Sequence, residues 1–542
     1  MTSANKITSK DLKKFNYALQ LQNRGEFKSA IHIYESIYIS NPSIIEIKLN
    51  LATCFFGTED FLRAAQLFHA LHIEDPDNAV ILNYCAVTYL KLNQNQLALD
   101  FLKRLVNKEP SNLDAWVNLT YVANLLNNNT DSLYYATQAL SLNPNETKLY
   151  NNMGSALQTI HRYKDAMVCY ETALLLDSSN VNAITNIATI LDKQANYYES
   201  IKKYQEAIDL FVVNPNELNE IQYRMSFPLL GAGNLDLGWE YYDKGFEISG
   251  GRGRTPNRKF QIPQWNGKKI IGGKLLIWRE QGLGDEVWFY SLIHEVLNYC
   301  ENITIECSSR LLSLVQRAFP TCTVRIETPF SELADLNTFD FHIPVGSLCR
   351  IFRSSWENFS PSKGYLKPDA ELLNIFSSRL ASFQRKLLVG ISWRSGNLLT
   401  SRNIHYAPIS DWEPIFKVPN IQFVNLQYGE CSEEIFNVKK YYDVDILNFE
   451  DIDLKNDLES VAAIIHNLDL VISVSTFISP FTQALGTPLM LINHKNWSML
   501  GQSKWPWYES VKVYCPDNLS LPINSVFDKV VIDLLTFKKN GA

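Results

Sequence analysis

The feature that most constrains this chain is a 34-residue period across its first 215 residues. Small residues recur at that spacing, at Ala30, Ala64, Ala98, Ser132, Ala166 and Ser200. A second column lies twelve positions earlier, at Ala18, Ala52, Ala86, Thr120, Gly154 and Ala188. A repeat of this length is typical of a helix-turn-helix unit whose small residues lie where the paired helices approach closely. Six units exceed the roughly three that such a stack needs to bury a continuous core.

Prolines close the first four units, at Pro42, Pro76, Pro110 and Pro144. Over residues 10–215 the array resembles tetratricopeptide-repeat domains. The resemblance implies an N-terminal α-solenoid of six repeats.

An asparagine column occupies one place in the first helix of five repeats, at Asn16, Asn50, Asn118, Asn152 and Asn186. A side-chain amide both donates and accepts, so such a ladder suits the backbone of an extended peptide of any sequence. The alternative is that these amides only satisfy neighbouring helices. The column resembles the asparagine ladder of O-linked N-acetylglucosamine transferase, which implies a groove that binds an acceptor protein.

The bulk composition excludes several partners. The formal net charge is −7 and no cluster of Lys or Arg stands out, so we expect no nucleic-acid partner. Nine scattered cysteines form no C-x-x-C pair, which favours reduced thiols over a zinc site or a disulfide frame.

The sequence predicts no membrane span and no signal segment. Its polar start, MTSANKITSKDLKK, has no apolar signal core. The longest apolar region, Leu468–Ile492, is broken by serine, proline and glycine, which suits a strand, helix and strand. We therefore expect a cytoplasmic protein.

Residues 216–262 form a connecting segment. The pattern predicts one helix over Gly233–Glu247, which would cap the array. The basic, glycine-rich stretch Ser249–Lys259 is typical of a hinge or loop.

Strands and helices alternate after this segment. The first set, in residues 263–380, has strands predicted at Lys274–Arg279, Asn302–Cys307, Thr323–Glu327 and Phe339–Val345. The second set, in residues 385–538, has them at Leu387–Trp393, Ile421–Tyr428, Asp443–Leu447, Leu470–Val474 and Leu489–Ile492. Such alternation predicts two Rossmann-like domains with parallel sheets, facing one another across a cleft.

The stretch KLLIWREQGLGDEVWF, Lys274–Phe289, reads as strand, tight loop and helix. We expect Gly282 and Gly284 to allow positive φ, and the helix beginning near Asp285 to present unpaired amides to an anion. Only half of the dinucleotide fingerprint is present, because Val287 replaces the third glycine.

Asp285 has two interpretations. It is a good N-cap for the following helix, which needs no chemistry. Alternatively, a carboxylate beside bare glycines at a cleft can accept a proton from an incoming hydroxyl.

The strand ends of the second set carry candidate donor-binding residues. They are Trp393, Arg394, Ser395, Gly396, Asn397, Arg402, Gln427, Ser475 and Thr476. Ser479–Pro480 is typical of an N-cap followed by proline in the first turn, so Ser475–Ile478 would form a loop aimed at a helix N-terminus. Helix-end amides and an arginine would stabilise a diphosphate there.

From Pro263 to Asp517 the chain resembles family 9 glycosyltransferases of the heptosyltransferase type, and more closely their bacterial branch with fused tetratricopeptide repeats. The matching strings, in family order, are REQGLGDEVWF, FDFHIPVGSL, GYLKPD, VGISWRSGN, NLQYG, DLESVAAIIHNLDLVISVST, QALGTPLMLI and WPWYESVKVY. The resemblance implies a GT-B pair of domains, Asp285 as the family's base, and the Ser475–Thr476 turn as part of the diphosphate site.

Two departures put the donor site in doubt. Ser475 stands where the family has aspartate, and Pro480 where it has histidine. The nearby aromatic residues Trp497, Trp505, Trp507 and Tyr508 suit either stacking on a sugar or base, or packing between loop and core.

No metal site or cofactor is expected. Asp443-Val-Asp445 and Asp451-Ile-Asp453 have the D-x-D form that holds a divalent ion on a nucleotide-sugar. Both lie in acidic surroundings away from the expected cleft, and GT-B enzymes generally work without a bound metal.

These features predict an inverting, metal-independent glycosyltransferase that moves a sugar from a nucleotide-sugar to a Ser or Thr hydroxyl of a protein. The repeat-fused relatives imply flagellin or another surface protein as acceptor. The alternative is a non-catalytic repeat adaptor whose transferase half has lost donor binding. A close relative of O-linked N-acetylglucosamine transferase fits the ladder but not the C-terminal strings.

Overall fold

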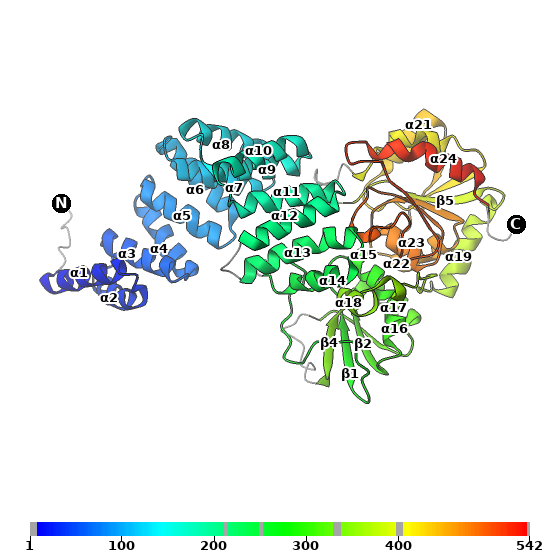
Figure 1. The fold of residues 1–542 in the computed structure, drawn as a ribbon, viewed down its shortest axis with the longest axis horizontal. Coiled ribbons are helices and arrows are strands. Elements are labelled where there is room, and N and C mark those ends of the chain that lie inside the picture. Colours follow the sequence, from blue (N-terminus) through cyan, green and yellow to red (C-terminus); the bar gives the residue numbers. More distant parts are fainter. Residues whose placement is uncertain (1–7, 211–214, 249–252, 329–337, 397–404, 539–542) are drawn as a thin grey trace. The chain divides into compact units, whose positions relative to one another are not determined.

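The computed structural model describes residues 8–210, 215–248, 253–328, 338–396 and 405–538. The chain divides into two compact units, Met1–Ala183 and Ile184–Ala542. The first unit is helical, and the second contains further helices and two sheets (Figure 1).

The first unit consists of consecutive helix pairs. They are α1 (Ser9–Asn23), α2 (Phe27–Ser40), α3 (Ile45–Gly57), α4 (Phe61–Glu74), α5 (Ala79–Lys91), α6 (Asn95–Lys108), α7 (Leu113–Leu125), α8 (Asn129–Leu142), α9 (Thr147–Thr159) and α10 (Tyr163–Leu176). Both predicted columns of small residues are buried. At Gly154 an added Cβ would lie 2.4 Å from the Tyr170 ring, so the close approach of paired helices is confirmed.

A further 34-residue period appears in the backbone. The turn inside each repeat holds one residue with positive φ, at Gly25, Glu59, Asn93, Asn127, His161 and Ala195. A left-handed residue commonly ends a helix, and glycine or asparagine adopts it with least strain. Because the side chains in this column differ, residue type alone does not reveal it.

Ala195 offers a test of this backbone column. Its φ is 57°, where the Cβ of alanine is strained. We expect Ala195→Gly to raise the free energy of unfolding by about 0.5–1 kcal/mol, the relief of strain less the backbone entropy of glycine. Urea denaturation measures it. Ala188→Gly, inside a helix, should instead lower stability, and equal losses in both variants would contradict the assignment.

The second unit begins within α11 (Val181–Lys193) and continues with α12 (Tyr197–Leu210), α13 (Pro215–Gly231) and α14 (Leu235–Asp243). Residues 216–262 thus hold two helices where the sequence predicted one. Pro228 lies inside α13 and hides its helical pattern. Trp239 of α14 is buried, and its indole N–H donates to the carbonyl of Arg353 at 3.0 Å. The helix pair α13 and α14 is therefore part of the α/β core.

The segment predicted as a hinge or loop anchors the chain to this core. Among its described residues, the Arg254 side chain is fully buried between Glu280 and Asp243. Its guanidinium lies 4.3 Å from the ring centroid of Tyr242 and 4.2 Å from that of Phe246. The described residues of the segment form a loop, as one of the two predicted alternatives has it, and the buried Arg254 side chain ties this loop to the core.

The first sheet has four parallel strands in the order β3-β2-β1-β4. They are β1 (Lys274–Trp278), β2 (Asn302–Cys307), β3 (Thr323–Ile326) and β4 (Phe341–Pro344). Its helices are α15 (Leu283–Tyr290), α16 (Ile293–Val296), α17 (Leu312–Ala318) and α18 (Leu348–Phe352). All four predicted strands are confirmed.

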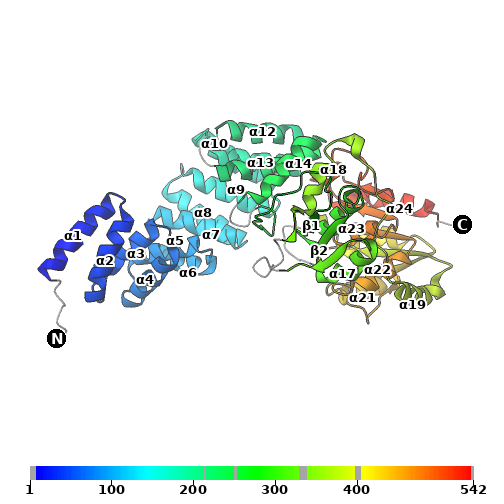
Figure 2. The same ribbon diagram turned by 90° about the horizontal axis from the view of Figure 1, so that it is seen from below.

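The second sheet has six parallel strands in the order β10-β9-β8-β5-β6-β7. They are β5 (Leu387–Ser392), β6 (Ile421–Asn425), β7 (Ile446–Leu447), β8 (Leu470–Val474), β9 (Leu489–Ile492) and β10 (Val511–Tyr514). The helices are α19 (Ala370–Leu380), α20 (Glu413–Phe416), α21 (Ser432–Tyr442), α22 (Leu458–His466), α23 (Ile478–Ala484) and α24 (Phe527–Thr536) (Figure 2). The sequence predicted five of these strands and missed β10, a half-exposed edge strand.

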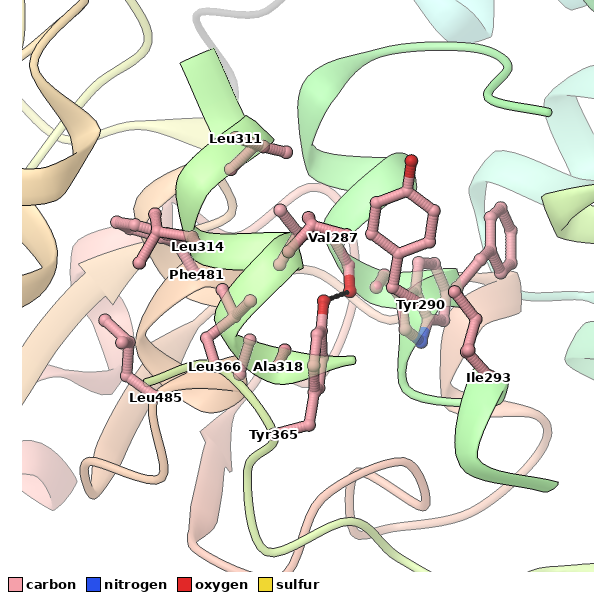
Figure 3. Packing of buried hydrophobic residues seen from close by; sticks show 14 of the residues in the cluster. Val287, Tyr290, Ile293, Leu311, Leu314, Ala318, Tyr365, Leu366, Phe481 and Leu485 are labelled. Carbon is pink, nitrogen blue, oxygen red and sulfur yellow. Dashed lines mark hydrogen bonds between the residues drawn. The ribbon is translucent and has the colours of Figure 1, made fainter. Parts of the chain in front are cut away.

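One apolar core joins the two sheets. Figure 3 shows Val287 of α15, Phe481 of α23 and Leu485, the residue after α23, among its members. The hydroxyl of Tyr365 donates to the carbonyl of Val287 at 2.5 Å, and its backbone N–H donates to the carbonyl of Ala484 at 2.7 Å. Tyr365 thereby links α15 to the last residue of α23. None of the helices in the described ranges has the length and hydrophobicity that a membrane span requires.

Candidate functional site

A cavity of about 460 Å³ lies where α15 meets α23. These helices follow β1 and β8, so the cavity lies at the carboxyl ends of strands of both sheets, where α/β proteins bind ligands. An added Cβ at Gly284 would be in ordinary van der Waals contact, 3.6 Å from Cγ of Pro480. An alanine would therefore fit at this position, and the approach of the two helices does not depend on Gly284.

The start of α15 differs from the prediction. The helix begins at Leu283, with Gly282 as N-cap at a φ of −86°. The left-handed residue is Gln281, with a φ of 57°, so the expectation of positive φ at the two glycines is wrong. The strain falls on Gln281 because the chain must turn sharply between β1 and α15.

Asp285 is the third helical residue and is half-buried at the cavity wall. Its Oδ2 accepts a hydrogen bond from the backbone N–H of Gly282 at 3.2 Å. Gly282 holds the N-cap position, so the predicted position of the cap is wrong, but Asp285 caps the helix from its third residue and the predicted capping role is confirmed. The hydrogen bond fixes the carboxylate at the helix start, facing the cavity.

A buried ion pair holds α15 in place. Glu286 accepts from Arg279 Nε at 2.8 Å, from the N–H of Ser308 at 2.7 Å and from the hydroxyl of Tyr290 at 3.0 Å. Burial raises the pKa of Glu286, and the charge of Arg279 opposes that rise. The sequence analysis did not identify Glu286, because a charged residue next to Asp285 is expected to be exposed to solvent.

The expected donor residues after β5 divide into two groups. Gln427 is buried, and its Oε1 accepts from the backbone N–H groups of Trp393 at 3.1 Å and Arg394 at 3.0 Å. Trp393 Nε1 donates to Glu434 at 2.8 Å, and Arg394 Nε donates to the same carboxylate at 3.0 Å. Trp393, Arg394 and Gln427 therefore build the strand ends, and the Arg394 guanidinium is directed to α21 rather than to a diphosphate.

Ser395 does line the cavity, together with Tyr428. Gly396 is exposed, and an added Cβ would lie 2.6 Å from the Tyr428 ring. Asn397 and Arg402 lie outside the described residues.

The turn after β8 brings Ser475 and Thr476 to the wall of the same cavity as Asp285. Helix α23 begins at Ile478 with Phe477 as N-cap, so Ser479 is the second helical residue and the predicted Ser-Pro cap is wrong. The Ser479 hydroxyl instead donates to the carbonyl of Val474 at 2.8 Å. Because the Ser479 hydroxyl bonds back to the end of β8, it does not cap α23, and the helix begins one residue before Ser479.

The four aromatic residues after β9 divide between the cavity wall and the core. Trp497 and Trp505 line the cavity, whereas Trp507 and Tyr508 are buried in the core. Trp288 of α15, which the sequence did not single out, also lines the cavity. Its helical spacing of three residues from Asp285 places both on one face, a signal that could have identified it.

The asparagine column is partly engaged by its neighbours. Asn16 is exposed, and Asn50, Asn118, Asn152 and Asn186 are half-buried. Asn50 donates to the carbonyl of Glu46 at 2.8 Å. In the second unit, Arg224 donates to Oδ1 of Asn186 at 3.2 Å. The contacts of Asn50 and Asn186 match the alternative in which these amides satisfy neighbouring groups.

The two D-x-D pairs bond to nearby cations. Lys439 Nζ lies 2.8 Å from Asp443 and 2.9 Å from Asp445. Both oxygens of Asp451 accept from Arg379 at 2.7 Å. Asp453 accepts from the N–H of Lys455 at 2.9 Å in a tight turn.

Comparison with known proteins identifies the repeats. A tetratricopeptide-repeat family model matches residues 55–120. Protein FlbA of Caulobacter vibrioides is 32% identical over 317 residues, which cover 56% of this chain and 52% of FlbA. The chain thus spans about half the length of this curated relative.

Solved structures also match the chain. MamA from Desulfovibrio magneticus RS-1 is 18% identical, covers 32% of this chain and 99% of its own, and has a TM-score of 0.31. YrrB, described as a TPR protein with an unusual peptide-binding site, is 16% identical, covers 32% of this chain and 92% of its own, and also has a TM-score of 0.31. The N-terminal region contains tetratricopeptide repeats.

Proposed function

We propose that this protein is a metal-independent GT-B glycosyltransferase that moves a sugar from a nucleotide-sugar to a Ser or Thr hydroxyl of a protein acceptor. One observation carries the proposal. The Asp285 carboxylate, fixed by the Gly282 N–H, shares a cavity with the Ser475–Thr476 turn at the carboxyl ends of two parallel sheets.

Asp285 would act as the general base. It takes the proton of the acceptor hydroxyl as that oxygen attacks the anomeric carbon from the face opposite the leaving group. A new glycosidic C–O bond forms, the bond from the anomeric carbon to the phosphate oxygen breaks, and the nucleoside diphosphate leaves with the electron pair. The configuration at the anomeric carbon inverts.

The donor diphosphate would lie at the Ser475–Thr476 turn. The hydroxyls and backbone amides of this turn are donors suited to developing negative charge. Arg402, which lies outside the described residues, would supply the cation that Arg394 does not.

The acceptor would reach Asp285 from the repeats. A second cavity of about 610 Å³ is lined by Tyr197 and Tyr198 of α12, Gly231 of α13 and the loop after β9. Asn496 lines both this cavity and the one that holds Asp285. An extended segment of an acceptor such as flagellin or another surface protein would therefore pass from the last repeat helices to the base.

Tyr198 tests this route. Its side chain is 78% exposed, so its removal should not affect folding. We expect Tyr198→Ala to raise KM for the protein acceptor about tenfold, equivalent to about 1.4 kcal/mol. Hydrolysis of the donor by water should be unchanged. Tyr441→Ala, at an equally accessible tyrosine outside both cavities, is the control, and an equal effect of both variants would contradict the route.

We assign the reaction to the cytoplasm. All nine cysteines are free thiols, and burial raises the pKa of several, including Cys85 and Cys307 to about 12. Unpaired, unreactive thiols suit a reducing compartment.

A second function, a non-catalytic adaptor, is favoured by one observation. Of the described residues that line the Asp285 cavity, none carries a positive charge. A thermal-shift screen of nucleoside diphosphates and nucleotide-sugars separates the two functions. Stabilisation by a nucleotide and its sugar conjugate supports the transferase, and stabilisation by none supports the adaptor.

A further inference from the structure

Three buried N–H donors line the Asp285 cavity without an acceptor. They are Trp288 Nε1, Trp505 Nε1 and Gln483 Nε2, and within the described ranges none has a hydrogen-bond partner. Trp288 is 8% exposed and Gln483 is 3% exposed. Buried polar groups in native proteins are almost always satisfied, so three orphaned donors around one cavity require an explanation.

Three indole rings, those of Trp288, Trp497 and Trp505, form an aromatic wall of the cavity. The ring of Trp288 lies 5.5 Å from that of Trp497, with the planes at 30°, and 5.7 Å from that of Trp505. Indole faces pack against the C–H face of a sugar ring, while the indole N–H donates to an oxygen at its edge. Trp288 lies three residues after Asp285 on α15, so the two side chains are on one face of the helix.

The charge of the cavity restricts the ligand further. Among its described lining residues, Asp285 alone is charged. The diphosphate would lie at the Ser475–Thr476 turn, but a carboxylate on a sugar next to Asp285 would have no positive partner among these residues and would be repelled by the Asp285 carboxylate.

We propose that Trp288, Trp505 and Gln483 form the pocket for the donor's sugar, and that this sugar is uncharged. The three donors bind hydroxyl or carbonyl oxygens of the ring substituents, and the indole rings stack on the ring itself. This inference rests on the proposed function, because it assigns the sugar of that same donor.

Calorimetry on the full chain tests the pocket. The probes are UDP, UDP-glucose, UDP-N-acetylglucosamine and UDP-glucuronate, with GDP and GDP-mannose as the second nucleotide series. The variants are Trp505→Phe, which removes the N–H and keeps a ring, and Gln483→Met, which keeps the length. Trp356→Phe, at a 38% exposed tryptophan outside the cavity, is the control.

We expect each pocket variant to weaken binding of the uncharged nucleotide-sugar about tenfold while leaving affinity for the free nucleotide unchanged. Removal of an orphaned donor should not lower the melting temperature of the ligand-free protein, which a purely structural role would. Equal affinity of variants and wild type for the nucleotide-sugar, or preferred binding of UDP-glucuronate, overturns the pocket alone. Failure of the wild type to bind any nucleotide or nucleotide-sugar contradicts the proposed function itself.

Discussion

Replacing Asp285 with asparagine should lower the rate of sugar transfer by about 10²–10⁴-fold, the usual effect of removing a general base. Asparagine keeps the shape of the side chain, and its Oδ1 can still accept from the Gly282 N–H, so α15 should begin at the same residue. The amide cannot take the proton of the acceptor hydroxyl. Single-turnover transfer to a protein acceptor measures the loss directly.

The control for this variant is Asp236→Asn, in the exposed first turn of α14. It makes the same chemical change away from the cavity and should leave the rate unaltered. Binding of the donor should persist in Asp285→Asn, because the Ser475–Thr476 turn is untouched. Full transfer by this variant would show that Asp285 is not the base.

Arg254→Ala should lower the free energy of unfolding of the second unit by about 3–5 kcal/mol, since it leaves a buried carboxylate without its counter-charge. The guanidinium is fully buried, and it donates to Asp243 at 2.7 Å and to the hydroxyl of Ser347 at 3.0 Å as well as to Glu280. When Arg254 is lost, Glu280 keeps the hydrogen bond from the N–H of Gly346, at 2.8 Å, but has lost its counter-charge. Urea denaturation measures the change.

Two further variants test whether the loss of stability comes from an unpaired buried charge or from general disruption of the fold. Arg379→Ala breaks a surface pair with Asp451 and should cost at most about 1 kcal/mol. The double variant Arg254→Met with Glu280→Met removes both buried charges and should recover much of the lost stability. A loss of stability in Arg254→Ala no larger than that in Arg379→Ala would mean that the buried Arg254–Glu280 pair does not stabilise the fold.

Periodic features of this chain were predictable because they follow from local sequence. The small-residue columns, such as Ala30 and Ala64, identify helix contacts within one repeat, and apolar runs such as Leu470–Val474 identify buried parallel strands. Each depends only on residues a few positions apart. The parallel pairing then follows from the alternation of strands and helices.

Contacts between distant residues were not predictable. Arg254 looks like linker charge until Glu280 and Asp243 enclose it, and Arg394 looks like a phosphate ligand until Glu434 binds it. The helix starts differ from the prediction for another reason, because local hydrogen bonds join Asp285 to Gly282 and Ser479 to Val474.

The candidate site was predicted in outline and not in detail. Its two main elements, Asp285 and the Ser475–Thr476 turn, are in one cavity. The sequence analysis named Trp497 and Trp505 but not Trp288 or Gln483, because Trp288 has the pattern of an ordinary core residue and Gln483 that of an ordinary helical residue. Only the fold shows that both border the same space.

The central claim is that Asp285 transfers a proton during sugar transfer to a protein. Mass spectrometry of a flagellin or other surface protein, coexpressed with the wild type or with Asp285→Asn, tests it most directly. We predict a sugar mass on Ser or Thr of the acceptor with the wild type and its absence with the variant. The same sugar occupancy with both proteins, or no added mass with the wild type on any acceptor, would contradict the claim.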